Sequence, residues 1–136
     1  LLSDYNGYNI SCFNTNDGWI DFDVNGSVPP YSFNWNIGTN QEDNNMLFAG
    51  NYSVQIQDLN LCSTSVDISL TQPSPLVSEI NSIMDYNGYD ISCNGYNDGA
   101  IEISVNGSLP PYSLSWNTGQ NTDALTDLTS GTYTLQ

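Results

Sequence analysis

The chain has no lysine, arginine or histidine, and this absence narrows the functions that it can perform. Among its 136 residues are 15 acidic side chains and no basic one, which gives a formal net charge of -15. Nucleic acid is close to excluded as a partner and an anionic membrane is disfavoured, because both are bound through basic side chains. A Ser-His-Asp triad, the cationic clamp of phosphoryl transfer and a Lys-Asn isopeptide bond are impossible.

Long apolar runs are missing as well. No stretch of about 18 apolar residues is present, so the sequence predicts no transmembrane helix and no direct membrane insertion. No signal peptide is visible, because its first region needs positive charge, and we expect the sequence to be part of a longer mature chain. Aromatic residues make up 12% of the chain and charged residues only 11%, which favours a folded protein over a disordered one.

The sequence contains an internal repeat with an offset of 81 residues. Residues 4–55 align with residues 85–136 without a gap, and 28 of these 52 pairs are identical by direct count. The alignment predicts two domains: repeat one at 1–74, with its first strand truncated, and repeat two at 75–136, with its C-terminal strands truncated. The segment Thr71–Leu76 between them carries two prolines, which predicts a stiff, extended junction.

Apolar residues alternate with polar ones within each repeat, which predicts β-strands. Turn signals such as Asn6-Gly7 and Asp17-Gly18 separate the strands, and only 41–48 is expected to form a short turn or loop. Strands with turns about every 8 to 12 residues predict an all-β fold of tandem β-sandwich repeats, with a period of 81 residues. The alternating positions are Ile20, Phe22 and Val24, then Tyr31, Phe33 and Trp35, then Tyr52, Val54 and Ile56, then Val66, Ile68 and Leu70, with Ile101, Ile103 and Val105 in the second copy.

Two pairs of aromatic residues are expected to be structural. Tyr52 and Tyr133 each end the pattern Leu-x-x-Gly-x-Tyr, which resembles a tyrosine corner, where the hydroxyl bonds back to the backbone as the chain enters a strand. Trp35 and Trp116 alternate in phase with the apolar set and are predicted to lie in the core. Trp19 is out of phase and should face outward, where it could stack on a sugar in the first repeat only.

The three cysteines, Cys12, Cys62 and Cys93, are candidates for a disulfide. Cys12 and Cys93 are equivalent in the repeat. The simple interpretation is a disulfide between Cys12 and Cys62, with Cys93 paired to a residue beyond the sequence, and the alternative is three free thiols. A disulfide would indicate an oxidising, extracytoplasmic compartment.

Two loops rich in Asn and Asp are candidate calcium sites, because hard cations prefer oxygen ligands that lie close together. The alternative is that Asn-Asp-Gly makes a hairpin turn with positive φ. The sequence favours the turn, together with diffuse stabilisation by divalent cations. A glycosidase would need two carboxylates across a cleft, but Asp23 is replaced by Ser104 in the second copy, so no catalytic residue is predicted. The candidate ligands are Asn14, Asn16, Asp17 and Asp21 in the first copy and Asn97, Asp98 and Glu102 in the second.

Three motifs recur in the same order in both copies. Cys-x5-Gly-x-Ile, at 12–20 and 93–101, is followed by Val-Asn-Gly-Ser-x-Pro-Pro-Tyr-Ser-x-x-Trp-Asn-x-Gly and then by Leu-x-x-Gly-x-Tyr. Together they resemble the SprB repeat family of gliding-motility adhesins and other giant surface proteins of Bacteroidetes-type bacteria. Asn60-Leu61-Cys62 departs from the usual Asn-Gly-Cys ending of that family. The resemblance implies an immunoglobulin-like sandwich, export by the type IX secretion system and display as a filament on the bacterial cell surface.

These observations predict a structural and adhesive stalk repeat of a long extracellular filament and not an enzyme. Its expected partners are neighbouring repeats of the same chain and an extracellular polysaccharide or solid surface. No cofactor is certain, and calcium is the one candidate. The alternative is a carbohydrate- or calcium-dependent binding module attached to a secreted hydrolase, which would occur once or twice beside a catalytic domain.

Overall fold

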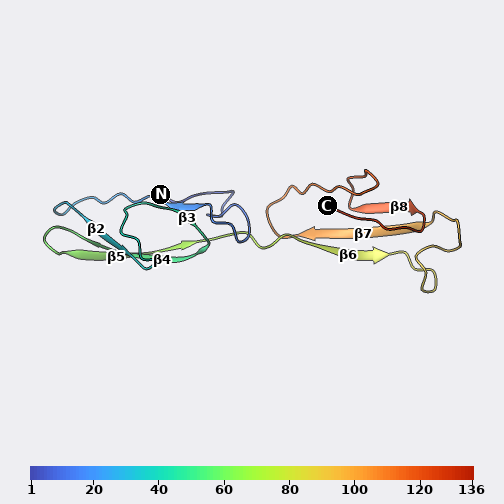
Figure 1. Cartoon of the computed structure of the whole chain (residues 1–136), viewed down its shortest axis with the longest axis horizontal. Helices are drawn as coiled ribbons and strands as arrows, with labels where there is room; N and C mark the ends of the chain where they lie inside the picture. The colour runs from blue at the N-terminus through green and yellow to red at the C-terminus, as the bar shows by residue number, and fades with distance from the viewer. The chain divides into compact units, whose positions relative to one another are not determined.

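The computed structural model describes all residues 1–136 and contains eight strands and no helix, which confirms the all-β prediction (Figure 1). No segment of it is a helix that could cross a membrane. The chain divides into two compact units, unit 1 at Leu1–Pro75 and unit 2 at Leu76–Gln136. Unit 1 holds β1 (Gly18–Ile20), β2 (Ser32–Trp35), β3 (Asn44–Leu47), β4 (Gly50–Gln57) and β5 (Ser63–Leu70), and unit 2 holds β6 (Val77–Ile83), β7 (Gly99–Asn106) and β8 (Ala124–Leu128).

The larger sheet of unit 1 has the order β2-β4-β5 and is antiparallel throughout. Its strands form where the sequence alternates, and the two-residue period places one set of side chains on the inner face. Along β4 these are Tyr52, Val54 and Ile56, all of which are buried. The whole of β4 pairs with β5, from Gly50 opposite Leu70 to Gln57 opposite Ser63.

A second, two-stranded sheet of unit 1 joins β1 to β3. Residues 41–48, expected as a turn or loop, contain β3, so that prediction is wrong. The sequence does not show the alternation of a strand here, because Asn44 and Leu47 face inward while the exposed Met46 adopts φ 55° and forms a bulge. β1 is shorter than predicted and ends at Ile20.

One hydrophobic core lies between the two sheets of unit 1. Phe22 packs edge-on against Trp35, with ring centroids 5.7 Å apart, although Phe22 lies outside β1. Both sheets contribute side chains to this core, because each sheet has one apolar face that packing against the other removes from water. The buried members are Ile10, Ile20, Trp35, Leu47, Tyr52, Val54, Ile56 and Leu70.

Unit 2 contains a three-stranded antiparallel sheet, β6-β7-β8. β7 corresponds to β1 at the offset of 81 but runs for 8 residues instead of 3, because β6 pairs along most of its length. β8 pairs with the other edge of β7, and its side chains Leu125 and Leu128 are buried. The core of this unit is smaller and has four buried hydrophobic residues: Ile103, Trp116, Leu125 and Leu128.

The Asn-Gly turns form as predicted in both units. Asn6 and Gly7 have φ values of 53° and 91°, and the flanking Tyr5 and Tyr8 exchange two backbone hydrogen bonds. Positive φ at both central residues is typical of the two-residue turn that matches the strand twist. The same geometry returns at Asn87-Gly88 in unit 2.

Candidate functional site

Each unit has one tyrosine whose hydroxyl bonds back to the backbone, Tyr52 in unit 1 and Tyr133 in unit 2. The hydroxyl of Tyr52 donates to the carbonyl of Phe48 at 2.8 Å, and that of Tyr133 donates to the carbonyl of Thr129 at 2.8 Å. Burial raises the pKa of Tyr52, while its hydrogen bond to Phe48 works in the opposite direction. The corner therefore anchors the start of β4 through a buried phenol.

Each unit has one tryptophan in its hydrophobic core, Trp35 in unit 1 and Trp116 in unit 2. Trp35 and Trp116 are buried, and each indole N–H donates to a backbone carbonyl six residues later, Gln41 or Thr122, at 2.8 Å. This bond satisfies the single polar group of a core tryptophan. Trp19 is exposed on β1, as its phase predicts.

The Asn- and Asp-rich loops are organised by a serine and an aspartate. The backbone N–H of Ser11 donates to Asp17 Oδ1 at 3.1 Å, and the Ser11 hydroxyl donates to the same carboxylate. Ser92 and Asp98 repeat the arrangement in unit 2. These hydroxyl bonds hold the pKa of Asp17 and of Asp98 below its ordinary value, against a smaller opposing effect of desolvation.

The glycine after each of these aspartates does not form the predicted hairpin turn. Gly18 lies in β1, and a Cβ there would meet Ile10 Cδ1 at 2.5 Å and the carbonyl oxygen of Leu47 at 2.9 Å. Gly99 is equally crowded. Close packing therefore requires glycine at these two positions. The residue with positive φ in the loop of unit 1 is Asn14.

The candidate calcium ligands are not gathered into an acidic cluster. No group of three or more acidic or cysteine side chains is close enough to hold a metal ion. Asp17 and Asp21 lie at opposite ends of β1, the Asp17 carboxylate accepts bonds from Ser11, and Glu102 accepts a bond from Ser82. Calcium binding by these loops stays a prediction.

The predicted disulfide between Cys12 and Cys62 does not form, and all three cysteines are free and exposed. Cys62 directly precedes β5, whereas Cys12 lies beside the residues that follow β5, since the N–H of Asn14 donates to Gln72 Oε1 at 2.8 Å. A strand of eight residues spans roughly 25 Å. The Cα atoms of a disulfide lie within about 7 Å, so the two ends of β5 are too far apart to be bridged.

A carboxylate that the sequence did not single out organises the turn between β4 and β5. Asp58 is buried, and its Oδ1 accepts a bond from the Cys62 N–H at 2.8 Å while its Oδ2 accepts one from the Ser27 hydroxyl. The bond from Ser27 is the largest cause that lowers the pKa of Asp58. In the sequence, this role of Asp58 is indicated by its position four residues before Cys62 in a turn, because aspartate commonly caps backbone N–H groups in turns.

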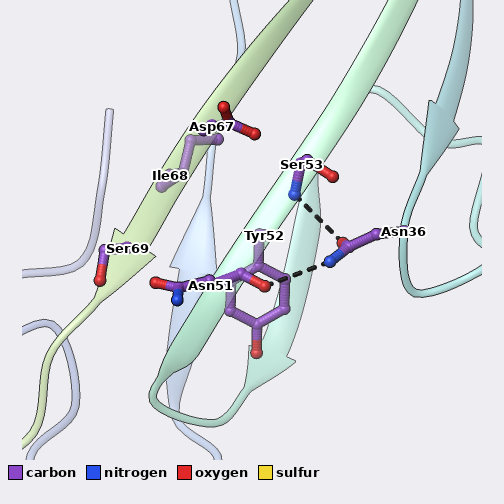
Figure 2. A pocket seen from close by; sticks show the side chains of 7 residues that line it. All are labelled: Asn36, Asn51, Tyr52, Ser53, Asp67, Ile68 and Ser69. Carbon is purple, nitrogen blue, oxygen red and sulfur yellow. Dashed lines mark hydrogen bonds between the residues drawn. The ribbon is translucent and has the colours of Figure 1, made fainter.

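A shallow depression of about 380 Å³ lies over β4 and β5 of unit 1 (Figure 2). The Asn36 side chain at its rim donates to the carbonyl of Asn51 at 3.2 Å and accepts from the N–H of Ser53 at 3.1 Å, so it extends the pairing of β2 with β4. Asn117 makes the equivalent bonds in unit 2. Asp67 is the only carboxylate among the lining residues, and the depression therefore lacks the facing pair that a glycosidase uses.

Comparison with known proteins identifies the repeat. The SprB repeat family matches the chain at residues 8–40 and again at 89–121. No curated protein matches the chain, and no solved structure does. The SprB repeat is a structural repeat found in cell-surface proteins. The two matched segments contain the same serine–aspartate loop and the same buried tryptophan, so each unit holds one match to the SprB repeat.

Proposed function

We propose that the chain is part of the stalk of a long extracellular adhesin filament, in which SprB repeats follow one another along the polypeptide. One observation carries the proposal: the same side-chain hydrogen bonds to the backbone recur in both units at the offset of 81 residues. The Tyr52 and Tyr133 corners and the bonds of Trp35 and Trp116 all close within their own unit. Modules that close their own contacts can be added in series without changing one another.

The charge of the chain fits an exposed position outside the cell. A net charge of -15 with no basic residue gives every unit a surface of one sign, which opposes association of neighbouring filaments. The absence of lysine and arginine also leaves trypsin-like proteases no cleavage site. Both properties suit a stalk that persists in the medium.

The immunoglobulin-like sandwich is the architecture that we propose for a complete repeat. Unit 1 has the three-stranded sheet β2-β4-β5, and unit 2 has the three-stranded sheet β6-β7-β8. At the offset of 81, β7 and β8 correspond to β1 and β3, which form the second sheet of unit 1. A repeat with both sheets would hold its core between two three-stranded layers.

By its family, we assign the filament to a gliding-motility type of adhesion, with export by the type IX secretion system. The motor and the substratum would act on the filament as a whole, and the units described here would transmit the force. No chemical step is required of them, which agrees with the structural character of the repeat.

Immunogold electron microscopy of intact source cells tests the proposal. An antibody raised against this chain should label long surface filaments at regular intervals. The same antibody absorbed with the purified chain is the control and should label nothing. Label found only in the medium, on polysaccharide or on a secreted hydrolase, would replace the stalk by an accessory binding module.

A further inference from the structure

Four of the Asn-Gly dipeptides of the chain occupy two pairs of equivalent positions, and the hydrogen bonds of the two pairs differ. All four asparagines are exposed. In such a dipeptide the backbone nitrogen of glycine can attack the side-chain carbonyl carbon of asparagine, because glycine has no Cβ that hinders the approach. The attack requires the glycine N–H to lose its proton. The first pair is Asn6-Gly7 and Asn87-Gly88, and the second is Asn25-Gly26 and Asn106-Gly107.

In the first pair the glycine N–H is held by a carboxylate. The N–H of Gly7 donates to Asp4 Oδ1 at 2.8 Å, and the N–H of Gly88 donates to Asp85 Oδ1 in the same way. The residues that flank each dipeptide also exchange two backbone hydrogen bonds, which close the turn. A carboxylate in this position opposes loss of the proton, because the nitrogen anion would face a negative oxygen.

In the second pair the glycine N–H has no acceptor within the chain. The neighbouring tyrosine donates instead to the carbonyl of the same glycine, Tyr31 to Gly26 and Tyr112 to Gly107. Each bond holds the turn but leaves the N–H group unpaired. The glycine nitrogen of the second pair is therefore free to lose its proton to solvent.

The elements that lie beside the second pair do not occupy these N–H groups either. In unit 1 the carboxylate of Asp58 accepts the hydroxyl of Ser27, the residue after Gly26, and not the glycine N–H. In unit 2 β6 pairs with β7 as far as Val77 opposite Asn106, and the N–H of Gly107 still has no partner. The free N–H thus recurs in both units with different neighbours in place.

We propose that Asn25 and Asn106 are sites of spontaneous conversion to aspartate and isoaspartate, whereas Asn6 and Asn87 are protected from it. The glycine nitrogen gives its proton to hydroxide and forms a bond to Cγ of the asparagine. The bond between Cγ and the side-chain nitrogen breaks, and this nitrogen takes a proton from water and leaves as ammonia.

The product of this step is a succinimide ring, which water then opens at one of its two carbonyl carbons. Opening at Cγ gives aspartate, and opening at the main-chain carbonyl carbon gives isoaspartate, in which the chain runs through the side chain. Either product adds one carboxylate to a chain whose net charge is already -15. Water is the only reagent, so exposure to the medium is sufficient for the reaction.

Peptide mapping of the aged chain tests the proposal. The purified chain is incubated at mildly alkaline pH, quenched with acid and digested with pepsin, since trypsin has no cleavage site in it. Mass spectrometry then follows the replacement of amide by carboxyl at each asparagine. Asn25 and Asn106 should convert at least about tenfold faster than Asn6 and Asn87, because a hydrogen bond to a charged group changes a rate by about this factor. In urea, where the folded contacts are absent, the four rates should converge.

A variant of the protecting carboxylate tests the physical cause. Asp4→Ala should raise the rate at Asn6 about tenfold and leave Asn87 slow, and Asp85→Ala should do the reverse. An unchanged urea midpoint would show that each variant remains folded, as the exposure of both aspartates leads us to expect.

Equal rates at the four sites of the folded chain would overturn the proposal. It would also be overturned if Asn25 and Asn106 converted only in urea, or if Asp4→Ala left Asn6 as slow as before. No step of the reaction involves a filament or a partner, so failure of this inference would leave the stalk function standing.

Discussion

Asn44 of unit 1 and Leu125 of unit 2 occupy the same position in the repeat, and each lies opposite an isoleucine of the neighbouring strand, Ile20 or Ile101. Both side chains are buried, but only Asn44 carries polar groups there, and one of them is unpaired. Asn44 Oδ1 accepts a bond from Thr39 at 2.8 Å, while its Nδ2 has no partner. A buried donor without a partner costs about 1 to 3 kcal/mol.

We therefore expect Asn44→Leu to stabilise unit 1 by about 1 kcal/mol, from removal of the unpaired donor and added apolar burial, less the strain of a new side chain. Urea unfolding followed by the hydrogen exchange of unit 1 amides measures the change. The reciprocal Leu125→Asn should destabilise unit 2 by about 2 to 3 kcal/mol. A loss of stability in Asn44→Leu would show that β1 and β3 cannot accommodate the larger apolar group.

Removing the phenol of the tyrosine corner tests how much it contributes. Tyr52→Phe should destabilise unit 1 by about 1 to 2 kcal/mol, because the carbonyl of Phe48 loses its donor in a buried position. Tyr133→Phe should cost less, since Tyr133 is more exposed. Equal effects in the two units would mean that burial does not set the strength of this bond.

Tyr52 also predicts an alkaline effect. Its pKa is raised in the folded chain, so the folded state retains the proton more tightly than the unfolded state. Stability is therefore fully present below the unfolded pKa of about 10 and falls as pH rises above it. Thermal unfolding between neutral pH and about pH 11 should show a steeper loss in the native chain than in Tyr52→Phe.

The serine–aspartate loops predict the response to acid. The pKa values of Asp17 and Asp98 are lowered in the folded chain, mainly by the hydroxyls of Ser11 and Ser92. The unfolded state then binds more protons, so this stabilisation is present above the unfolded pKa of about 3.9 and is lost as pH falls through the folded value. Ser11→Ala should lower stability at neutral pH and flatten the acid loss in unit 1.

Ser92→Ala is the matched control for unit 2. Comparison of each variant with the native chain separates the loop from the general effect of protonating 15 carboxylates, which relieves repulsion. Urea midpoints between about pH 2 and 7 measure both. Parallel pH profiles for the native chain and Ser11→Ala would show that the hydroxyl does not set the pKa of Asp17.

The free thiols predict that redox conditions leave unit 1 unchanged. Cys12 and Cys62 are exposed at opposite ends of β5, so all three cysteines of the native chain should react with a thiol reagent. Cys12→Ser and Cys62→Ser should each unfold at the native urea midpoint under oxidising conditions. Mass spectrometry that found a Cys12–Cys62 crosslink within one chain would contradict the separation of the two residues.

Counterions should stabilise the chain through its net charge of -15. Added NaCl should raise the melting temperature, because screening weakens the repulsion among carboxylates. Ca²⁺ and Mg²⁺ should act alike at equal ionic strength if the effect is diffuse. A larger shift with Ca²⁺ that Asp17→Asn removes would instead establish the loop as a calcium site.

Several features of the molecule could be predicted from the sequence because they depend on neighbours along the chain. Alternation of apolar residues predicts β2, β4 and β5, since the strand period is two. The Asn6-Gly7 turn follows from the freedom of these residues at positive φ, and the corner of Tyr52 follows from a motif of six residues. Net charge and the repeat are properties of the sequence alone.

Only the tertiary structure decided what lies opposite each element. Gly18 is needed because Ile10 and the backbone of Leu47 approach it from other parts of the chain. Cys12 and Cys62 are kept apart by the length of β5, and β3 is held as a strand by β1 despite its weak pattern. Each of these depends on distances between residues far apart in sequence, which local periodicity and turn chemistry do not encode.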